Sequence, residues 1–370
     1  MSTAHAVEDL VSKTVNMPNV LNSVKKVSPR IGFLNRIKDM FMRLLKYVSS
    51  GQNWKTSPGL WIGALIFLRC ALVFLREYGL TLGKKDLSKD HVFLTGAGSG
   101  IGRLMAKRLG KMGSKLSISD INLPGVEETK NILVKEGVPA ANIHVMHLDV
   151  TKRASISEAA QSAKATFGTV TMLINNAGIV SGKSTLELTD AMIERTMAVN
   201  TTSHLHTIRE FLPDMIANKK GHIVSIASMA GLAGIPALPD YCASKWGAIA
   251  IDESIRTELK KQGHYGYIKT TCICPYFINT GMFEGAKKAF PMYILDQDEV
   301  TDRIINAIRQ EEASVVVPYR GNIVFLVKLL PTSVVDKISS ILGISAAMDD
   351  FKGRGAMTNR IPGLEAHVVK

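Results

Sequence analysis

Cysteine is scarce in this chain, and the cysteines that occur form no known ligand pattern. The 370 residues include four of them, Cys70, Cys242, Cys272 and Cys274. No pair has a C-x-x-C spacing and no set has the spacing of a zinc site, so a metal site is not predicted. A small secreted fold held by disulfides is also excluded. We therefore expect reduced thiols in a protein that faces the cytosol.

The chain also lacks an excess of acidic residues. Its formal net charge is +13, and the charge is uneven: residues 1–90 carry +8, whereas the remaining 280 residues carry only +5. A basic extension on a nearly balanced body favours an anionic partner, either lipid head groups or nucleic acid. No nucleic-acid-binding motif accompanies the charge, so nucleic acid is not expected as a partner.

No apolar run reaches the length that usually spans a membrane, but the N-terminal region has shorter segments of membrane-like character. Residues 1–30 are polar and aperiodic, and we expect them to be flexible. Residues 31–48 place apolar side chains on one helical face with Lys and Arg between them, which suits a membrane interface or packing on a domain. Residues 59–75 are strongly apolar apart from Arg69, and a span needs about 20 such residues. Residues 31–85 are thus predicted to be an amphipathic helix and a membrane anchor, either a short span or a monotopic insertion.

From residue 91 onward, short β-rich runs alternate with segments of helical length. Buried strands separated by helices predict an α/β fold with a doubly wound parallel sheet, a single Rossmann-like domain over residues 90–320. Residues 321–370 are expected to add an apolar helical segment and a polar tail. The expected strands are residues 91–94, 115–119, 143–148, 172–174, 222–226, 269–274 and, as a seventh, 315–317.

A glycine-rich loop follows the first expected strand and opens a helix. Gly96, Gly100 and Gly102 have the spacing G-x-x-x-G-x-G. Glycines in this position allow a tight turn and a close approach of the backbone to a pyrophosphate, which the N–H groups of the helix N-terminus bind. The loop therefore predicts a dinucleotide site at the carboxyl end of the sheet.

Acidic and amide residues end the next strands. Asp120 ends the second strand, 18 residues beyond Gly102. A carboxylate there accepts hydrogen bonds from a ribose 2′-OH and repels a 2′-phosphate, which favours NAD over NADP. A turn or capping role before Asn122 is the alternative. Asp149 and Val150 end the third strand, near the expected adenine, and residues 175–178 (Asn-Asn-Ala-Gly) follow the fourth.

Tyr241 and Lys245 lie four residues apart, on one side of an expected helix. The ammonium is expected to favour the phenolate and to lower the tyrosine pKa from its usual value of about 10. Ser228 stands 13 residues upstream of Tyr241, just after an expected strand. A Y-x-x-x-K spacing by itself is common on amphipathic surface helices, so it indicates a catalytic pair only in combination with the other motifs.

In order and spacing, these motifs resemble the short-chain dehydrogenase/reductase family over about residues 90–318. Within it, residues 174–183, 240–245, 269–285 and 342–351 are most similar to the membrane-associated retinol and hydroxysteroid dehydrogenase branch, and above all to the epidermal retinol dehydrogenase group. The chain departs from the family pattern in two places. Tyr276 follows Pro275 where many members have glycine, and the N-terminal region is longer than this branch leads us to expect.

The resemblance implies a catalytic tetrad. Tyr241 would be the general base, Lys245 would tune it and bind the nicotinamide ribose, Ser228 would contact the substrate oxygen, and Asn200 would kink a helix and hold a water molecule that links Lys245 to solvent. The implied NAD-binding positions are Gly96, Ser99, Gly100, Ile101, Gly102, Asp120, Asp149, Val150, Asn176, Ala177, Gly178, Tyr241, Lys245, Pro275, Ile278 and Thr280.

The resulting hypothesis is a membrane-associated oxidoreductase that transfers a hydride between a lipophilic alcohol and NAD, with retinol oxidation favoured. An apolar lid is expected after the sixth strand, and residues 322–330 and 334–342 are expected to cover the pocket or to enter the membrane near its mouth. A hydroxysteroid or long-chain alcohol, or a non-catalytic lipid-surface scaffold, are the alternatives. The expected location is the cytosolic face of the endoplasmic reticulum membrane or of a lipid droplet, and the family commonly forms homodimers. The expected lid residues are Met282, Phe283, Phe290, Met292, Tyr293 and Ile294.

Overall fold

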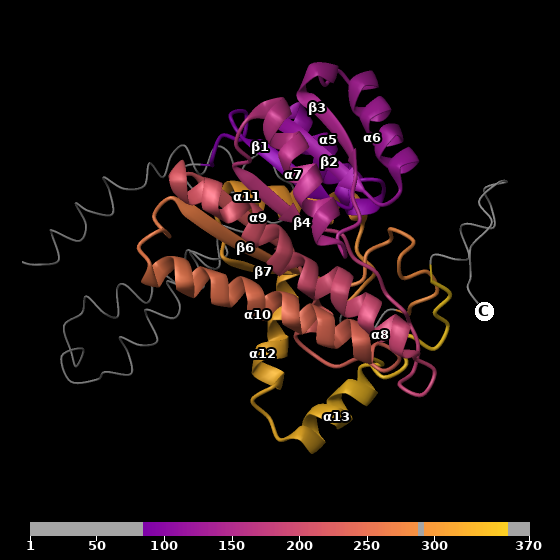
Figure 1. Cartoon of the computed structure of the whole chain (residues 1–370). Helices are drawn as coiled ribbons and strands as arrows, with labels where there is room; N and C mark the ends of the chain where they lie inside the picture. The colour runs from indigo at the N-terminus through magenta and orange to yellow at the C-terminus, as the bar shows by residue number, and fades with distance from the viewer. Residues whose placement is uncertain (1–83, 288–291, 354–370) are drawn as a thin grey trace, which may run out of the picture. The chain divides into compact units, whose positions relative to one another are not determined.

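A parallel sheet of seven strands runs through the middle of the described chain (Figure 1). The structure is a computed structural model that describes residues 84–287 and 292–353. The spatial order of the strands is β3-β2-β1-β4-β5-β6-β7. The predicted Rossmann-like fold is confirmed, and each expected strand is correct to within one residue at either end. The strands are β1 (His91–Thr95), β2 (Lys115–Asp120), β3 (Ile143–His147), β4 (Met172–Asn175), β5 (Gly221–Ile226), β6 (Ile268–Pro275) and β7 (Ser314–Val317).

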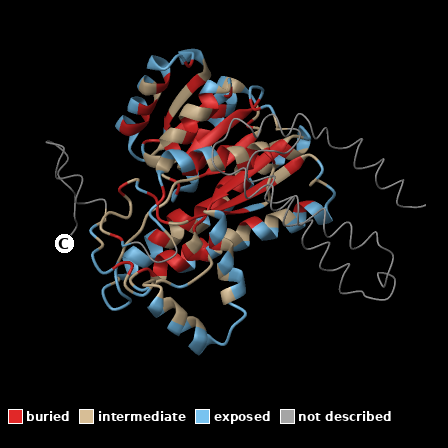
Figure 2. Ribbon diagram, turned by 180° about the vertical axis from the view of Figure 1, so that it is seen from behind, coloured by how far each residue is buried: buried red, intermediate tan, exposed pale blue. Residues whose placement is uncertain are grey.

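Helices cover both faces of the sheet, which is the most deeply buried layer in Figure 2. One face packs on α5 (Gly100–Lys111), α6 (Leu123–Lys135) and α11 (Gln297–Arg309). The other face packs on α7 (Arg153–Phe167), α9 (Ser203–Ala217) and α10 (Pro239–Lys261). The helix α8 (Asp190–Met197) precedes α9, and α12 (Ile323–Val327) and α13 (Thr332–Ile341) follow β7.

The central strand β1 illustrates why this sequence forms a buried sheet. All five of its residues are buried, as expected for a parallel strand with helices on both faces. Successive side chains point to opposite faces, so Val92 and Leu94 join one core cluster whereas Phe93 joins the other. Phe93 packs against Phe211 of α9 with the ring centroids 4.6 Å apart. The apolar run of β1 thus ties both helical layers to the sheet.

The order of the strands creates a crevice between β1 and β4. The chain moves outward from β1 to β2 and β3, and then returns to place β4 on the other side of β1. Loops that leave the carboxyl ends of β1 and β4 therefore diverge, and ligands of doubly wound sheets bind in the crevice between them. The glycine loop follows β1, and Asn176 follows β4, so the predicted cofactor residues lie at this point.

Several predictions fall outside the described residues. These are the flexible segment of residues 1–30, the amphipathic helix and anchor up to residue 83, Phe290 of the lid, and the tail from residue 354. Among residues 84–287 and 292–353, no helix is long and apolar enough to cross a membrane.

A buried carboxylate just before β1 generates a prediction about stability. Asp90 lies 3.2 Å from Lys85 Nζ and 2.9 Å from Lys220 Nζ, and its Oδ1 accepts a hydrogen bond of 2.8 Å from the Thr171 hydroxyl. Burial alone would raise the pKa of Asp90, but the hydrogen bonds and the two lysines together lower it below 3.8. The carboxylate therefore stabilises the fold above about pH 4 and loses this effect as the pH falls through its lowered pKa.

We expect Asp90→Asn to lower the free energy of unfolding at pH 7 by about 1–3 kcal/mol, because two cations lose a buried partner. Urea unfolding at several pH values measures this, and the difference from the wild type should shrink below about pH 4. Asp86→Asn, a nearby change of an exposed carboxylate, is the matched control and should have little effect. Equal stability of Asp90→Asn and the wild type at pH 7 would contradict a stabilising role for the buried carboxylate.

Candidate active site

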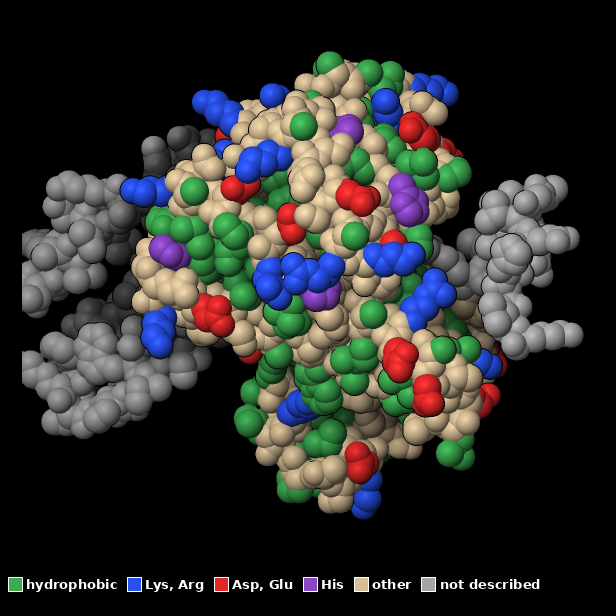
Figure 3. All heavy atoms as spheres, in the orientation of Figure 1, with side chains coloured by type: hydrophobic (Ala, Val, Ile, Leu, Met, Phe, Trp, Pro, Cys, Tyr) green, Lys and Arg blue, Asp and Glu red, His purple; other side chains and the backbone are tan. Residues whose placement is uncertain are grey.

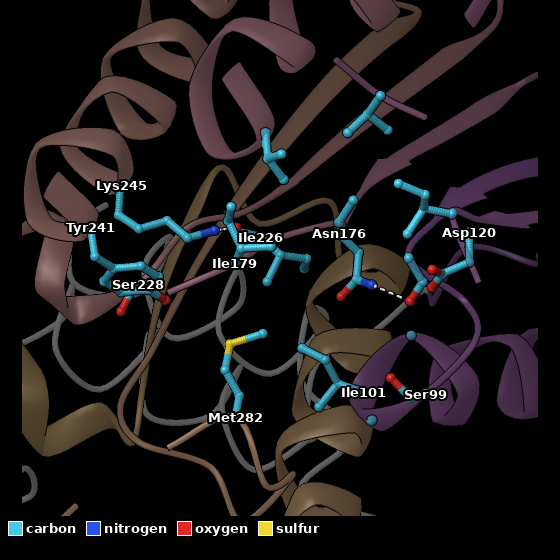
Figure 4. A pocket seen from close by; sticks show the side chains of 18 of the residues that line it. Ser99, Ile101, Asp120, Asn176, Ile179, Ile226, Ser228, Tyr241, Lys245 and Met282 are labelled. Atoms are coloured by element: carbon cyan, nitrogen blue, oxygen red, sulfur yellow. Dashed lines mark hydrogen bonds between the residues drawn. The ribbon is translucent and has the colours of Figure 1, made fainter. Parts of the chain in front are cut away.

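A cavity of about 560 Å³ opens at the crevice between β1 and β4 (Figure 4). This volume lies within the range of sites that hold small ligands and cofactors. Every residue predicted to bind NAD lines this cavity, and so does Ser228. Asn200 does not line it and lies behind it, fully buried.

The glycine loop is folded so tightly that side chains have no room. Gly96 and Gly100 have φ values of 69° and 54°, a region that glycine enters at little cost. A Cβ on Gly102 would lie 2.0 Å from the carbonyl oxygen of Gly96, so only glycine fits where α5 begins. The first turn of α5 contains no acidic residue. The loop therefore leaves the positive end of the helix dipole open to an anion.

Asn176 joins the glycine loop to the end of β4. Its Nδ2 donates hydrogen bonds of 2.9 Å to the carbonyl oxygens of both Thr95 and Gly96. The hydroxyl of Thr95 in turn accepts from the backbone N–H groups of Asn176 and Ala177, at 3.0 and 3.1 Å. Hydrogen bonds in both directions thus hold the end of β1 and the end of β4 at a fixed distance.

Asp120 stands at the carboxyl end of β2 and faces the glycine loop. Its Oδ2 accepts a hydrogen bond of 3.0 Å from the backbone N–H of Gly98, and its Oδ1 accepts one of 3.0 Å from Asn122. The turn role considered as an alternative is therefore real, but the same carboxylate also lines the cavity. The helix cap is a separate residue, because Asn122 accepts from Gly125 N at the start of α6.

Tyr241 and Ser228 face each other at one end of the cavity (Figure 4). Ser228 follows β5, accepts a hydrogen bond of 3.1 Å from the Ala230 N–H and donates one of 3.4 Å to the Pro275 carbonyl. Tyr241 lies in the first turn of α10, and its ring packs edge-on against Phe283 with the centroids 5.6 Å apart. Both side chains are nearly buried, so the residues packed around them limit how their hydroxyls can turn.

Lys245 lies one turn after Tyr241, with Nζ 5.8 Å from the centre of the phenol ring. It donates a hydrogen bond of 2.9 Å to the Ile226 carbonyl, and burial lowers the pKa of Lys245 to about 8. Burial raises the pKa of Tyr241 above 10, and the hydrogen bond with Ser228 opposes only part of that rise. The prediction of a lowered tyrosine pKa is wrong for these protein groups, because the loss of hydration on burial outweighs the effect that lowers the pKa.

Asn200 occupies a π-helical turn, Ala198–Thr202, between α8 and α9. Its Oδ1 accepts from the Ile179 N–H at 2.9 Å, and its Nδ2 donates to the Ile179 carbonyl at 2.9 Å and to Ser244 Oγ at 3.0 Å. A Cβ on Gly178 would lie 3.5 Å from both Asn200 Oδ1 and Lys245 Nζ, so the amide and the ammonium meet at this glycine. A π-turn has one residue more than an α-helical turn, and this extra residue explains why a polar side chain interrupts the apolar pattern of the helix.

A second buried carboxylate, Asp240, was not anticipated from the sequence. Its Oδ2 accepts hydrogen bonds of 2.7 Å from Ser181 and 2.8 Å from Thr196 of α8. Asp240 directly precedes Tyr241, so these bonds tie the first turn of α10 to α8 and to the loop after β4. A first-turn aspartate looks like an ordinary favourable charge at a helix N-terminus, and the sequence carried no signal for its distant partners.

The expected apolar lid is only partly in place. Met282 and Phe283 line the cavity. Tyr293 and Ile294 are exposed and do not line it, so their predicted role in the pocket is wrong; the chain turns back toward α11, and Tyr293 lies under Arg320 instead. Residues 322–342 do not contribute to the cavity wall either, and so do not cover the pocket.

The residues of the cavity fit a dinucleotide. The glycine loop and the N-terminus of α5 suit a pyrophosphate, and Asp120 suits a ribose hydroxyl. Tyr241, Ser228 and Lys245 lie at the opposite end of the same cavity from Asp120 (Figure 4). An extended ligand can therefore span from the carboxylate to the reactive hydroxyls.

The chain is similar to known proteins in sequence and in fold. The family model described as short chain dehydrogenase matches residues 90–289. Epidermal retinol dehydrogenase 2 of Mus musculus is 38% identical over 301 residues, which cover 80% of this chain and 96% of that protein. Estradiol 17-beta-dehydrogenase 11 of Homo sapiens is 36% identical over 264 residues, with coverages of 71% and 86%. A crystal structure of a short-chain dehydrogenase/reductase from Burkholderia phymatum in complex with NAD has a TM-score of 0.59 and 26% identity, and covers 66% of this chain and 94% of that one.

The buried ammonium of Lys245 should cost folding stability. Its pKa falls from 10.5 to about 8 on folding, so the unfolded chain binds the proton more tightly. Stability should therefore rise with pH between about 8 and 10.5 from this group. We expect Lys245→Met to raise the free energy of unfolding at pH 7 by about 1–3 kcal/mol, because it removes a buried charge. Urea unfolding measures the change; Lys260→Met, at an exposed position on α10, is the control. Destabilisation by Lys245→Met would show that the buried ammonium does not cost stability.

Proposed function

Because this chain belongs to the short-chain dehydrogenase family, and is thus an NAD(P)-dependent alcohol dehydrogenase, we propose that it oxidises a lipophilic alcohol with NAD. Retinol is the favoured substrate, and a hydroxysteroid or long-chain alcohol is the second candidate, since relatives are named for retinol and for estradiol. The observation that carries the proposal is one cavity that joins the glycine loop to Tyr241, Ser228 and Lys245. A non-catalytic scaffold is disfavoured, because it would need none of these three side chains.

The proposed chemistry divides between the cofactor and the protein. A bound nicotinamide supplies the hydride acceptor. Tyr241 acts as general base once its phenol has passed its own proton to the relay behind it, and it then takes the proton of the alcohol. Ser228 holds the substrate oxygen by a hydrogen bond while its charge develops. With a pKa of about 8, Lys245 is mostly charged at neutral pH yet releases a proton readily, so it suits a proton relay behind the tyrosine. Asn200 fixes the backbone of Ile179 at the point where this relay would continue.

The preference for NAD rests on the Asp120 carboxylate in the cavity wall. A 2′-phosphate placed beside this group would meet a like charge. Arg103 lies close by, but its Nη2 is engaged by the Gly98 carbonyl and by Glu128, each at 2.6 Å. Binding of NADP would require the arginine to leave these partners, so NAD is the proposed cofactor.

The apolar wall of the cavity supports a lipophilic substrate. Met282 and Phe283 lie beside Tyr241, and Phe283 continues into a cluster with Phe277 and Phe351. Such a wall offers dispersion contacts and no hydrogen-bond partner, which suits a polyene or a steroid better than a sugar or an acid. We further propose that residues 31–85 anchor the enzyme to the endoplasmic reticulum or to lipid droplets, with the catalytic domain in the cytosol, and that it forms a homodimer.

The tyrosine assignment gives a direct test. With NAD and a panel of all-trans-retinol and hydroxysteroids, we expect the wild type to oxidise at least one of these alcohols. Tyr241→Phe should lower kcat by at least about a thousandfold, because the general base and its proton path are lost together. Its affinity for NAD, measured by calorimetry, should change little. Retained turnover in Tyr241→Phe would exclude the mechanism.

The cofactor assignment is tested separately. We expect Asp120→Asn to raise the ratio of kcat/KM with NADP to that with NAD by about tenfold or more, because it removes the like charge but keeps the side-chain oxygen. Asp149→Asn is a matched control, since it removes a second carboxylate from the same cavity wall. The ratio should change much less there. A wild-type preference for NADP, or equal effects of both variants, would overturn the assignment.

A further inference from the structure

Two helices after β7 carry exposed apolar side chains and have no buried residue. α12 consists of Ile, Val, Phe, Leu and Val, and neither α12 nor α13 buries any residue in the described structure. Leu329 between them is 81% exposed, and Ile341 at the end of α13 is 83% exposed. In Figures 1 and 2 the pair projects from the body below α10. We call this pair of helices, with the residues between them, the apolar projection. Its exposed apolar residues are Ile323, Phe325, Leu326, Leu329, Leu330, Val334 and Ile341.

The apolar projection is fixed to the elements that carry the candidate site. Lys328 Nζ lies 4.3 Å from the ring centre of Trp246, the neighbour of Lys245 on α10. A Cβ on Gly321 would lie 2.8 Å from the Met229 sulfur, so the chain entering α12 packs closely on the turn that follows Ser228. The projection is therefore held in place beside the catalytic turn, and its exposure is a property of the fold.

The charges and aromatic rings around the projection match a lipid interface. Arg320, Lys328 and Lys337 are exposed, and Asp336 is the single acidic residue in residues 319–348. Aromatic rings that are partly exposed lie under two of these cations, Trp246 under Lys328 and Tyr293 under Arg320 at 4.6 Å. Figure 3 shows hydrophobic side chains, with a few basic ones among them, over this part of the surface. Aromatic and basic residues around an apolar tip are typical of proteins that lie in a membrane interface.

We propose that the apolar projection docks the catalytic domain onto a phospholipid surface, with its aliphatic side chains below the head groups and its cations among anionic ones. A second copy of the chain is a poorer occupant. A self-complementary interface would bring the cations of both copies together with only one acid each to balance them. The inference draws support from the proposed lipophilic substrate, but its test uses no cofactor, alcohol or turnover.

The test measures whether the projection enters lipid in the full-length protein. Cys242, Cys272 and Cys274 are buried, so a Cys70→Ser background allows labelling of one added exposed cysteine. Leu329→Cys and, as a second position, Ile341→Cys carry an environment-sensitive fluorophore. Val134→Cys on α6, at a position 41% exposed and far from the projection in Figure 1, is the matched control. The probe is a vesicle of phosphatidylcholine with or without phosphatidylserine, with spin-labelled lipid as quencher.

On vesicles that contain phosphatidylserine, we expect the emission at positions 329 and 341 to rise by about twofold or more and to be quenched by spin-labelled lipid. The signal at position 134 should stay unchanged, and the rise should be smaller without the anionic lipid. Three results would overturn the proposal. The first is that the labels remain in water when vesicles are present. The second is that the labels are protected without vesicles at every protein concentration, which would indicate that residues 1–83 cover the projection. The third is that protection increases with protein concentration alone, which would indicate a second copy of the chain.

Discussion

The hydrogen bonds of Asn176 to the carbonyl oxygens of Thr95 and Gly96 hold together the structure on which the site depends. β1 and β4 are neighbours whose loops turn apart, and these bonds close the base of the crevice between them. The amide also occupies the space above the loop, because a Cβ on Gly102 would lie 2.6 Å from Asn176 Nδ2. The glycines thus accommodate a side chain of the protein as well as a ligand. Any shift of β4 would move the anion site at the start of α5.

The other half of the site depends on polar groups that bind across elements. Asn200 holds the backbone of Ile179, and Asp240 holds Ser181 and Thr196, so α8, α10 and the loop after β4 form one unit. Tyr241 and Lys245 are therefore positioned by bonds that reach beyond their own helix. A buried ammonium and a buried phenol are each unfavourable. The hydrogen-bond network offsets the hydration that the Lys245 ammonium and the Tyr241 phenol lose on burial.

The fold and most of the cavity could be predicted from the sequence because their signals are local. The apolar run of β1 and the spacing of Gly96 to Gly102 are each visible within a dozen residues. The partners of Asp240 were not predicted, because Ser181 lies 59 residues away along the chain and nothing local marks the pair. The direction of the Tyr241 pKa was missed for a related reason. Helical spacing shows that Lys245 is near, but the extent of burial emerges only from the packed structure.

The π-helical turn at Ala198–Thr202 has a consequence for how this region can change through evolution. A π-turn contains one residue more than an α-helical turn, so it behaves as an insertion absorbed within a helix. Loss of one residue before Asn200 would let α8 and α9 merge into a regular helix. The fold would persist, but Asn200 would rotate by about 100° away from Lys245. A one-residue deletion at this turn would therefore uncouple the proton relay from the fold that carries it.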